Sequence, residues 1–210
     1  MAKTIPTLKE QGLAQGTRSP RAEAIVADAI RLITEEGYGE FSLRKVAARN
    51  GIKLASLQYH FKTKEVLLNA VLDQVLREYE ERFNEGDPDL YTSIAPEQLL
   101  EFTIDFLLVD NQLLDSTNFF FQLYAMSCHD ASAAKVQEKI YALYRKTIGD
   151  LIQMVNPALS AAERNIRSIV IISMVDGLML FISEGKSQRR HVSKIAKQVK
   201  KQALRIAMDK

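Results

Sequence analysis

Residues 41–64, FSLRKVAARNGIKLASLQYHFKTK, decide the fold of this chain. Their pattern predicts two short helices joined by a tight turn, followed by the start of a third helix. Ser42 can cap the first helix, which we expect to extend to about Asn50, because its hydroxyl can accept hydrogen bonds from the free amides of the opening turn. Gly51 can adopt the positive φ angle at which such a helix ends. The stretch is therefore typical of a helix-turn-helix.

The first of these helices has one apolar face and one cationic face. Val46 and Ala47 fall on the apolar side, whereas Arg44 and Lys45 point the other way. We expect this cationic side to face the phosphates of DNA, with three residues as candidate contacts: Ser42, Arg44 and Lys45.

The second helix, expected over residues 54–61, has a surface that suits the major groove of DNA. Leu57 and Phe61 are four residues apart and so face the core together. Gln58 can make paired hydrogen bonds to an adenine edge, and Leu54 can contact a thymine methyl group. The exposed arc and leading end of this helix supply the remaining candidate DNA contacts: Lys53, Leu54, Ala55, Ser56, Gln58, Tyr59 and His60.

The segments SLRKVA, NGI, SLQYHF and TKEVLL within residues 41–68 resemble the DNA-binding domain of the TetR (tetracycline repressor) family of bacterial regulators. In that family, two aromatic residues near the end of the recognition helix and the lysine that opens the next helix hold phosphates. The resemblance implies this role for Tyr59, His60 and Lys64. The sequence departs from the common family pattern at Lys53, where serine or threonine is usual, and at Gln58, where tyrosine is frequent.

Length and cysteine content indicate a soluble chain from a reducing compartment. A chain of 210 residues can bury a sizeable core. Its one cysteine, Cys128, permits no internal disulfide, and no signal peptide is apparent, so we expect a cytoplasmic location. The apolar run over residues 169–182 is 14 residues long and contains Asp176, and a membrane span needs about 20.

The net charge of +2 hides an asymmetry between the two parts of the chain. Residues 1–64 carry 11 Lys/Arg and 6 Asp/Glu, whereas residues 65–210 carry 17 and 20. The basic excess therefore coincides with the helix-turn-helix, as expected for a module that faces phosphates.

We predict an all-α protein with an N-terminal three-helix DNA-binding domain and a larger α-helical domain for ligand binding and dimerisation. The expected division is a flexible arm over residues 1–18, the DNA-binding domain over 19–64, a connecting helix over 65–85, and the second domain over 86–210. Helical periodicity in the second domain predicts helices over residues 96–109, 115–128, 132–155, 160–185 and from 192 onward.

Aromatic residues in the second domain are candidates for an effector pocket. Three adjacent phenylalanines, residues 119–121, cannot all face one side of a helix. A pocket for a small apolar or amphipathic organic effector could be lined by these residues: Phe102, Phe106, Phe120, Tyr124, Met126, His129, Tyr144 and Asp176. Aromatic and methionine residues at helical spacing are more often core, and that a pocket exists is mainly what the family resemblance implies.

The last two helices are candidates for a homodimer interface. The helix over residues 160–185 is apolar on nearly all sides, and the last helix carries apolar residues at steps of three and four. The expected interface residues are Ile169, Ser173, Gly177, Val192, Ile195, Val199 and Ile206. Such a dimer would place two recognition helices about 34 to 36 Å apart and require a pseudo-palindromic operator.

These features predict a DNA-binding transcriptional regulator, and the resemblance implies a repressor. An enzyme is disfavoured because Cys128 and His129 point about 100° apart on a helix and no phosphate loop or metal-ligand spacing appears. We therefore expect no catalytic residue, metal or cofactor. A helical adaptor that binds only protein is the remaining alternative, but it would leave the basic recognition face unexplained.

Overall fold

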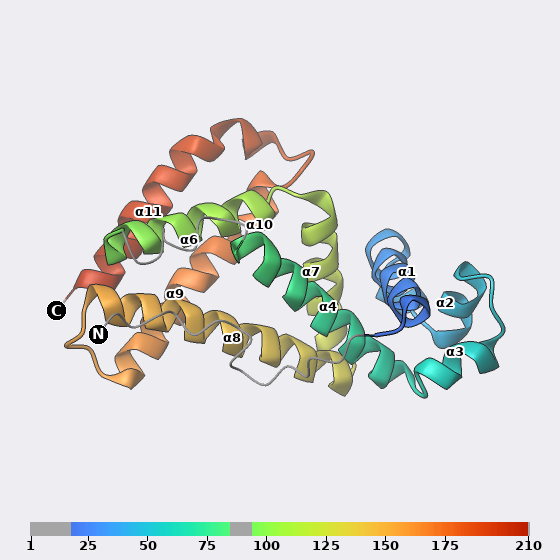
Figure 1. Ribbon diagram of the computed structural model, residues 1–210. Coiled ribbons are helices and arrows are strands. Elements are labelled where there is room, and N and C mark those ends of the chain that lie inside the picture. The colour runs from blue at the N-terminus through green and yellow to red at the C-terminus, as the bar shows by residue number, and fades with distance from the viewer. Residues whose placement is uncertain (1–17, 85–93, 210) are drawn as a thin grey trace. The chain divides into compact units, whose positions relative to one another are not determined.

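The computed structural model describes residues 18–84 and 94–209, and every regular element in these ranges is helical. The predicted all-α fold is therefore confirmed. The expected arm over residues 1–18 lies outside the described residues except for Arg18. In chain order (Figure 1) the elements are α1 (Pro20–Glu36), η2 (Tyr38–Glu40), α2 (Leu43–Arg49), α3 (Leu54–His60), α4 (Lys64–Asn84), α6 (Pro96–Asp110), α7 (Leu114–Ser127), α8 (Ala131–Val155), α9 (Ala161–Gly177), α10 (Met179–Ile182), η3 (Ser187–His191) and α11 (Val192–Met208).

The described residues form two compact units. The N-terminal unit contains residues 18–84 and 118–138, and the C-terminal unit contains residues 94–117 and 139–209. This grouping differs from the division expected from sequence, because most of α7 and the start of α8 belong with the N-terminal unit. The physical reason is that apolar side chains of α7 pack against α1 and α4.

The N-terminal unit is built on the buried face of α1. Ser19 caps this helix by accepting a hydrogen bond from the backbone N–H of Ala22 at 3.3 Å, and Pro20 occupies the first turn. Apolar residues from α1, α2, α3 and α4 then fill the core. They include Ile25, Ala29, Leu32, Val46, Ala47, Leu57, Leu67 and Val71.

The C-terminal unit has its own apolar core, to which α6, α8, α9 and α11 contribute. Its members include Leu99, Ile104, Leu108, Leu151, Ile152, Ile171, Val175, Val199 and Ala203. Two polar contacts fix α11 to its neighbours. The ammonium group of Lys200 donates to Asp105 of α6 at 2.6 Å, and Arg167 of α9 donates to the backbone carbonyls of Ile206 and Asp209, both at 2.7 Å.

The segment that we expected as one helix over residues 160–185 is interrupted. Its predicted start is confirmed, since Ser160 and Glu163 form a capping box. The helix α9 ends at Gly177, and the N–H of Leu178 bonds to the carbonyl of Val175, three residues back, at 3.1 Å. Residues 161–182 are long and apolar enough to cross a membrane by length and composition alone. Core helices of soluble proteins meet the same criterion, and here Ile171, Ile172 and Val175 are buried in the core of the C-terminal unit.

Candidate nucleic-acid interface

The turn between α2 and α3 has the geometry that the sequence predicted. Ser42 accepts a hydrogen bond from the backbone N–H of Lys45 at 3.3 Å, which caps α2. Gly51 has a φ angle of 65°, in the left-handed region that favours glycine. The backbone N–H groups of Gly51 and Ile52 donate to the carbonyls of Ala48 and Ala47, both at 3.0 Å. These bonds fix where α3 begins relative to α2.

The helix α3 buries one edge and exposes the other. Leu57 is completely buried and Phe61 nearly so, as their spacing predicted. Tyr59 is 84% exposed and lies edge-on to His60, with ring centroids 5.3 Å apart. The predicted contacts Lys53, Ala55, Ser56 and Gln58 are also exposed, and Leu54 and His60 are partly exposed. The side chains suited to reading bases therefore lie on an open surface.

The cationic side chains around this surface differ in whether they form ion pairs. Arg44 and Lys53 are exposed and have no ion-pair partner among the described residues. Lys45 instead contacts Glu40 and lies 3.6 Å from Glu36, and its hydrogen bond to Glu40 raises the pKa of its ammonium group. The predicted cationic side of α2 is thus partly neutralised by acidic residues near the end of α1 and in η2.

Lys64 packs against an aromatic ring, a contact that the sequence did not predict. Its ammonium nitrogen lies 3.9 Å from the ring centroid of Tyr38, a cation–π contact, and burial lowers its pKa. The Tyr38 hydroxyl donates in turn to Asp130 at 2.7 Å. Tyr38 and Asp130 are 92 residues apart, and no periodicity or motif relates them.

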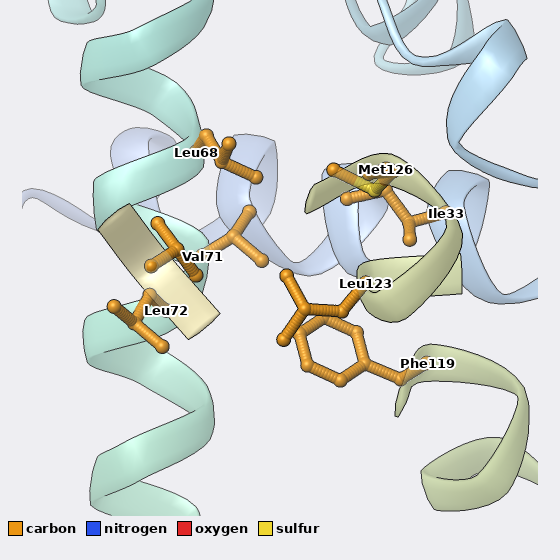
Figure 2. Close-up of a pocket in the computed structure, with 8 residues that line it drawn as sticks. Ile33, Leu68, Val71, Leu72, Phe119, Leu123 and Met126 are labelled. Carbon is orange, nitrogen blue, oxygen red and sulfur yellow. The ribbon is translucent and has the colours of Figure 1, made fainter. Parts of the chain in front are cut away.

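A small apolar space lies between α1, α4, α7 and α8 of the N-terminal unit (Figure 2). Its volume of about 10 Å³ is room for a single water molecule and too little for an organic effector. It is lined by Ile33, Leu68, Val71, Leu72, Phe119, Leu123, Met126 and Val136. Met126 alone among the predicted pocket residues contributes to it.

The predicted pocket residues are divided between the two units. Phe120, Tyr124, Met126 and His129 belong to the N-terminal unit, and Phe102, Phe106, Tyr144 and Asp176 to the C-terminal unit. Phe120 and Tyr124 pack together with centroids 6.1 Å apart, whereas His129 is exposed.

Asp176 of α9 is the one acidic residue among the predicted pocket residues, and its pKa is shifted. Its carboxylate accepts a hydrogen bond of 2.5 Å from the hydroxyl of Tyr141 on α8. Burial raises the pKa of Asp176 to about 6, although the hydrogen bond from Tyr141 acts in the opposite direction. The Tyr141 ring meets Tyr144 edge-on at 6.0 Å. Tyr141 is thus a residue of this site that sequence reasoning missed.

An apolar stripe runs along the exposed side of α9 and continues on α10. Its members recur at helical spacing and are Ile166, Ile169, Val170, Ser173, Gly177, Leu180 and Phe181, all exposed. Of the other predicted interface residues, Val199 is buried within its own chain, and Val192, Ile195 and Ile206 pack against the core of the C-terminal unit.

Residues 25–71, from α1 through the first turns of α4, match the sequence pattern of the family described as bacterial regulatory proteins, tetR family. The chain belongs to this family. Like its relatives, this TetR-family chain is a DNA-binding transcriptional regulator and not an enzyme, as the sequence predicted. The described residues also contain no cluster of His, Cys, Asp or Glu that could hold a metal ion.

Relatives of this TetR-family chain resemble it beyond the matched segment. It is 24% identical to the HTH-type transcriptional regulator BetI of Stenotrophomonas maltophilia over 172 residues, which cover 79% of this chain and 83% of BetI. Salmonella enterica GusR has the same fold, with a TM-score of 0.70 at 12% identity, covering 93% of this chain and 98% of GusR. A regulator from Saccharomonospora viridis, solved in complex with choline, gives a TM-score of 0.65 at 20% identity and covers 88% of this chain and 95% of its own.

Proposed function

We propose that this regulator binds a pseudo-palindromic operator as a homodimer, represses transcription there, and is released by a small organic effector. The observation that carries the proposal is the exposure of Gln58 and Tyr59 on α3. Leu57, which precedes them in the same helix, is fully buried in the core. A helix presented in this way can enter the major groove without any change in the core behind it.

Within this proposal the contacts divide by role. Gln58 reads a base edge, because its amide can both donate to and accept from adenine. Tyr59, Lys53 and Arg44 contact phosphates, because they surround the reading surface and are exposed. The phosphate contacts set the affinity for all DNA, and the base contact of Gln58 sets the preference among sequences.

The apolar stripe on α9 and α10 supports the homodimer. Ile169, Val170 and Phe181 expose large apolar side chains, which is costly in water unless a partner covers them. A second copy of the chain offers the same stripe, and a two-fold interface is formed by one surface on both subunits. Gly177 supports close approach, because it is exposed and no side chain beyond its two chain neighbours lies within 4 Å of its Cβ position.

The surroundings of Asp176 favour an effector that carries a positive charge. A buried carboxylate is disfavoured in its charged form, and an organic cation would offset that cost. Tyr141 adds an aromatic ring next to the carboxylate, and the ring of Tyr144 lies against that of Tyr141. Aromatic faces attract quaternary ammonium groups. The choline found with the structural relative from Saccharomonospora viridis is a cation of this kind.

Selection of bound duplexes from a random pool tests the DNA-binding part of the proposal. We expect enrichment of an inverted repeat whose half-sites are about one helical turn apart. Enrichment of a single unrepeated half-site would contradict the homodimer on DNA, and the absence of any enriched sequence would contradict operator recognition.

A thermal-shift assay with choline and its uncharged isostere 3,3-dimethylbutanol tests the effector class. We expect choline to raise the melting temperature and the alcohol to have a smaller effect, because only choline offsets the charge of Asp176. The matched variant Asp176→Asn should abolish the difference between the two ligands. Equal shifts by both ligands in the wild-type chain would contradict a cationic effector.

A further inference from the structure

We propose that Asp130 and Tyr38 are positioning residues for DNA binding, which hold the ammonium group of Lys64 where it meets a phosphate. The inference rests on the proposed DNA-binding function and on the phosphate contact that the family resemblance implies for Lys64, and it adds the two residues that place this lysine. All three belong to the N-terminal unit.

Asp130, the residue before α8, accepts three hydrogen bonds at its carboxylate. Its Oδ1 atom accepts hydrogen bonds from the backbone N–H groups of Ser132 at 2.8 Å and Ala133 at 3.2 Å. Its Oδ2 atom accepts the hydrogen bond from the Tyr38 hydroxyl at 2.7 Å. Both oxygens are therefore engaged, and the hydrogen bond from Tyr38 is the main reason that the pKa of Asp130 lies below its usual value.

Tyr38 is fixed at both of its ends. Its hydroxyl is held by Asp130, and its backbone N–H donates to the side-chain oxygen of Gln122 on α7 at 3.1 Å. The preceding residue, Gly37, has a φ angle of 87°, and a Cβ atom there would lie 3.1 Å from the same Gln122 oxygen. The Tyr38 ring is buried. Its position is thus set by the corner between α7 and α8.

Lys64 rests on this ring and keeps its hydrogen-bonding capacity. The ammonium nitrogen is 3.9 Å from the Tyr38 centroid and 5.5 Å from that of Phe41. No oxygen among the described residues accepts a hydrogen bond from it, so its three donors are available to an anion. The contact with Tyr38 orients the cation without using those donors.

A double-mutant cycle on DNA binding separates positioning from a merely structural role. The full-length chain, the variants Tyr38→Phe and Asp130→Asn, and the same variants combined with Lys64→Ala are titrated with a random-sequence duplex at several salt concentrations. Tyr38→Phe keeps the ring and removes the hydroxyl, and Asp130→Asn keeps a side chain that can cap α8. Ser116→Ala is the matched control, because it removes a hydroxyl-to-carboxylate hydrogen bond, from Ser116 to Asp110 at 2.9 Å, in the C-terminal unit.

We expect Tyr38→Phe and Asp130→Asn to weaken DNA binding roughly 2- to 5-fold when Lys64 is present, the range of one cation–π contact. We expect no further loss when Lys64 is alanine, and no loss for Ser116→Ala. Lys64→Ala itself should reduce the slope of log affinity against log salt by about 1. Thermal melts identify any variant whose loss comes from unfolding.

If Tyr38→Phe and Asp130→Asn lose equal DNA affinity with and without Lys64, the inference is overturned and the proposed function stays intact. Unchanged affinity for both single variants would have the same meaning. An unchanged salt slope for Lys64→Ala would also overturn the inference. A wild-type chain that binds no duplex would instead overturn the proposed function and this inference together.

Discussion

The carboxylate of Asp176 and the hydroxyl of Tyr141 are joined by a 2.5 Å hydrogen bond within the C-terminal unit, where burial raises the pKa of Asp176 from 3.8 to about 6. A carboxyl group with a raised pKa binds its proton more tightly in the folded chain than in the unfolded chain. Its contribution to stability is therefore complete below pH 3.8 and is lost as the pH rises through about 6.

This relationship predicts that Asp176→Asn stabilises the fold at neutral pH. Asparagine has no charge to desolvate, so the gain in the free energy of unfolding at pH 7.5 should approach roughly 3 kcal/mol, and it should shrink toward zero near pH 4. Thermal or urea unfolding of both chains between pH 4 and 8, at one protein concentration, measures this difference. A variant no more stable than wild type at pH 7.5 would contradict the prediction.

Gln58→Ala should relax sequence preference at one base pair of each operator half-site. The loss on the preferred operator should be about 1 to 3 kcal/mol, with little loss on a scrambled duplex, because a base contact distinguishes sequences. Lys64→Ala should weaken both duplexes alike. Fluorescence anisotropy with the two duplexes measures both effects, and Gln202→Ala, an exposed glutamine on α11, is the matched control. Equal losses on both duplexes for Gln58→Ala would refute its reading role.

If the proposed homodimer forms through the apolar stripe, Val170→Glu should convert it to a monomer without unfolding the chain. Val170 is 48% exposed in the single chain, so a charge there costs little until a second subunit covers it. Light scattering after size exclusion at micromolar concentration measures the mass. Ala162→Glu, at an exposed position outside the apolar stripe, should remain dimeric. If Val170→Glu has the same mass as wild type, the interface lies elsewhere.

Two Gly→Ala substitutions should have opposite effects on stability. Gly51→Ala should lower the free energy of unfolding by about 1 to 2 kcal/mol, because its φ of 65° is unfavourable for alanine. Gly149→Ala, inside α8 with no side chain beyond its two chain neighbours within 4 Å of the added Cβ, should raise it by roughly 0.5 to 1 kcal/mol. Chemical denaturation measures both values, and a shift in the same direction for both would contradict the backbone argument.

Sequence reasoning succeeded where the determining signals are local. The cap at Ser42, the turn at Gly51 and the buried position of Leu57 all follow from residues within about one helical turn of each other, and all are confirmed. The expected helix over residues 132–155 corresponds to α8 within one residue for the same reason.

Helical periodicity could not predict which distant segments pack together. Helical spacing shows that Val199 is buried, but it does not show whether the neighbour is a partner subunit or, as found, the same chain. The same limit applies to Phe102, which is 36% exposed despite its aromatic spacing, and to the hydrogen bond between Tyr38 and Asp130. Each depends on which distant helices meet, and that is set by the whole core.

In α3, the residues that stabilise the fold and the residues that face outward are different ones. Leu57 is fully buried and supports the domain, whereas Ala55, Ser56 and Gln58 are exposed. Exchanging these three side chains should therefore leave folding almost untouched while changing which promoter is recognised. Descendants of this gene could acquire new target genes through a few substitutions, and a designer could redirect the protein by the same route.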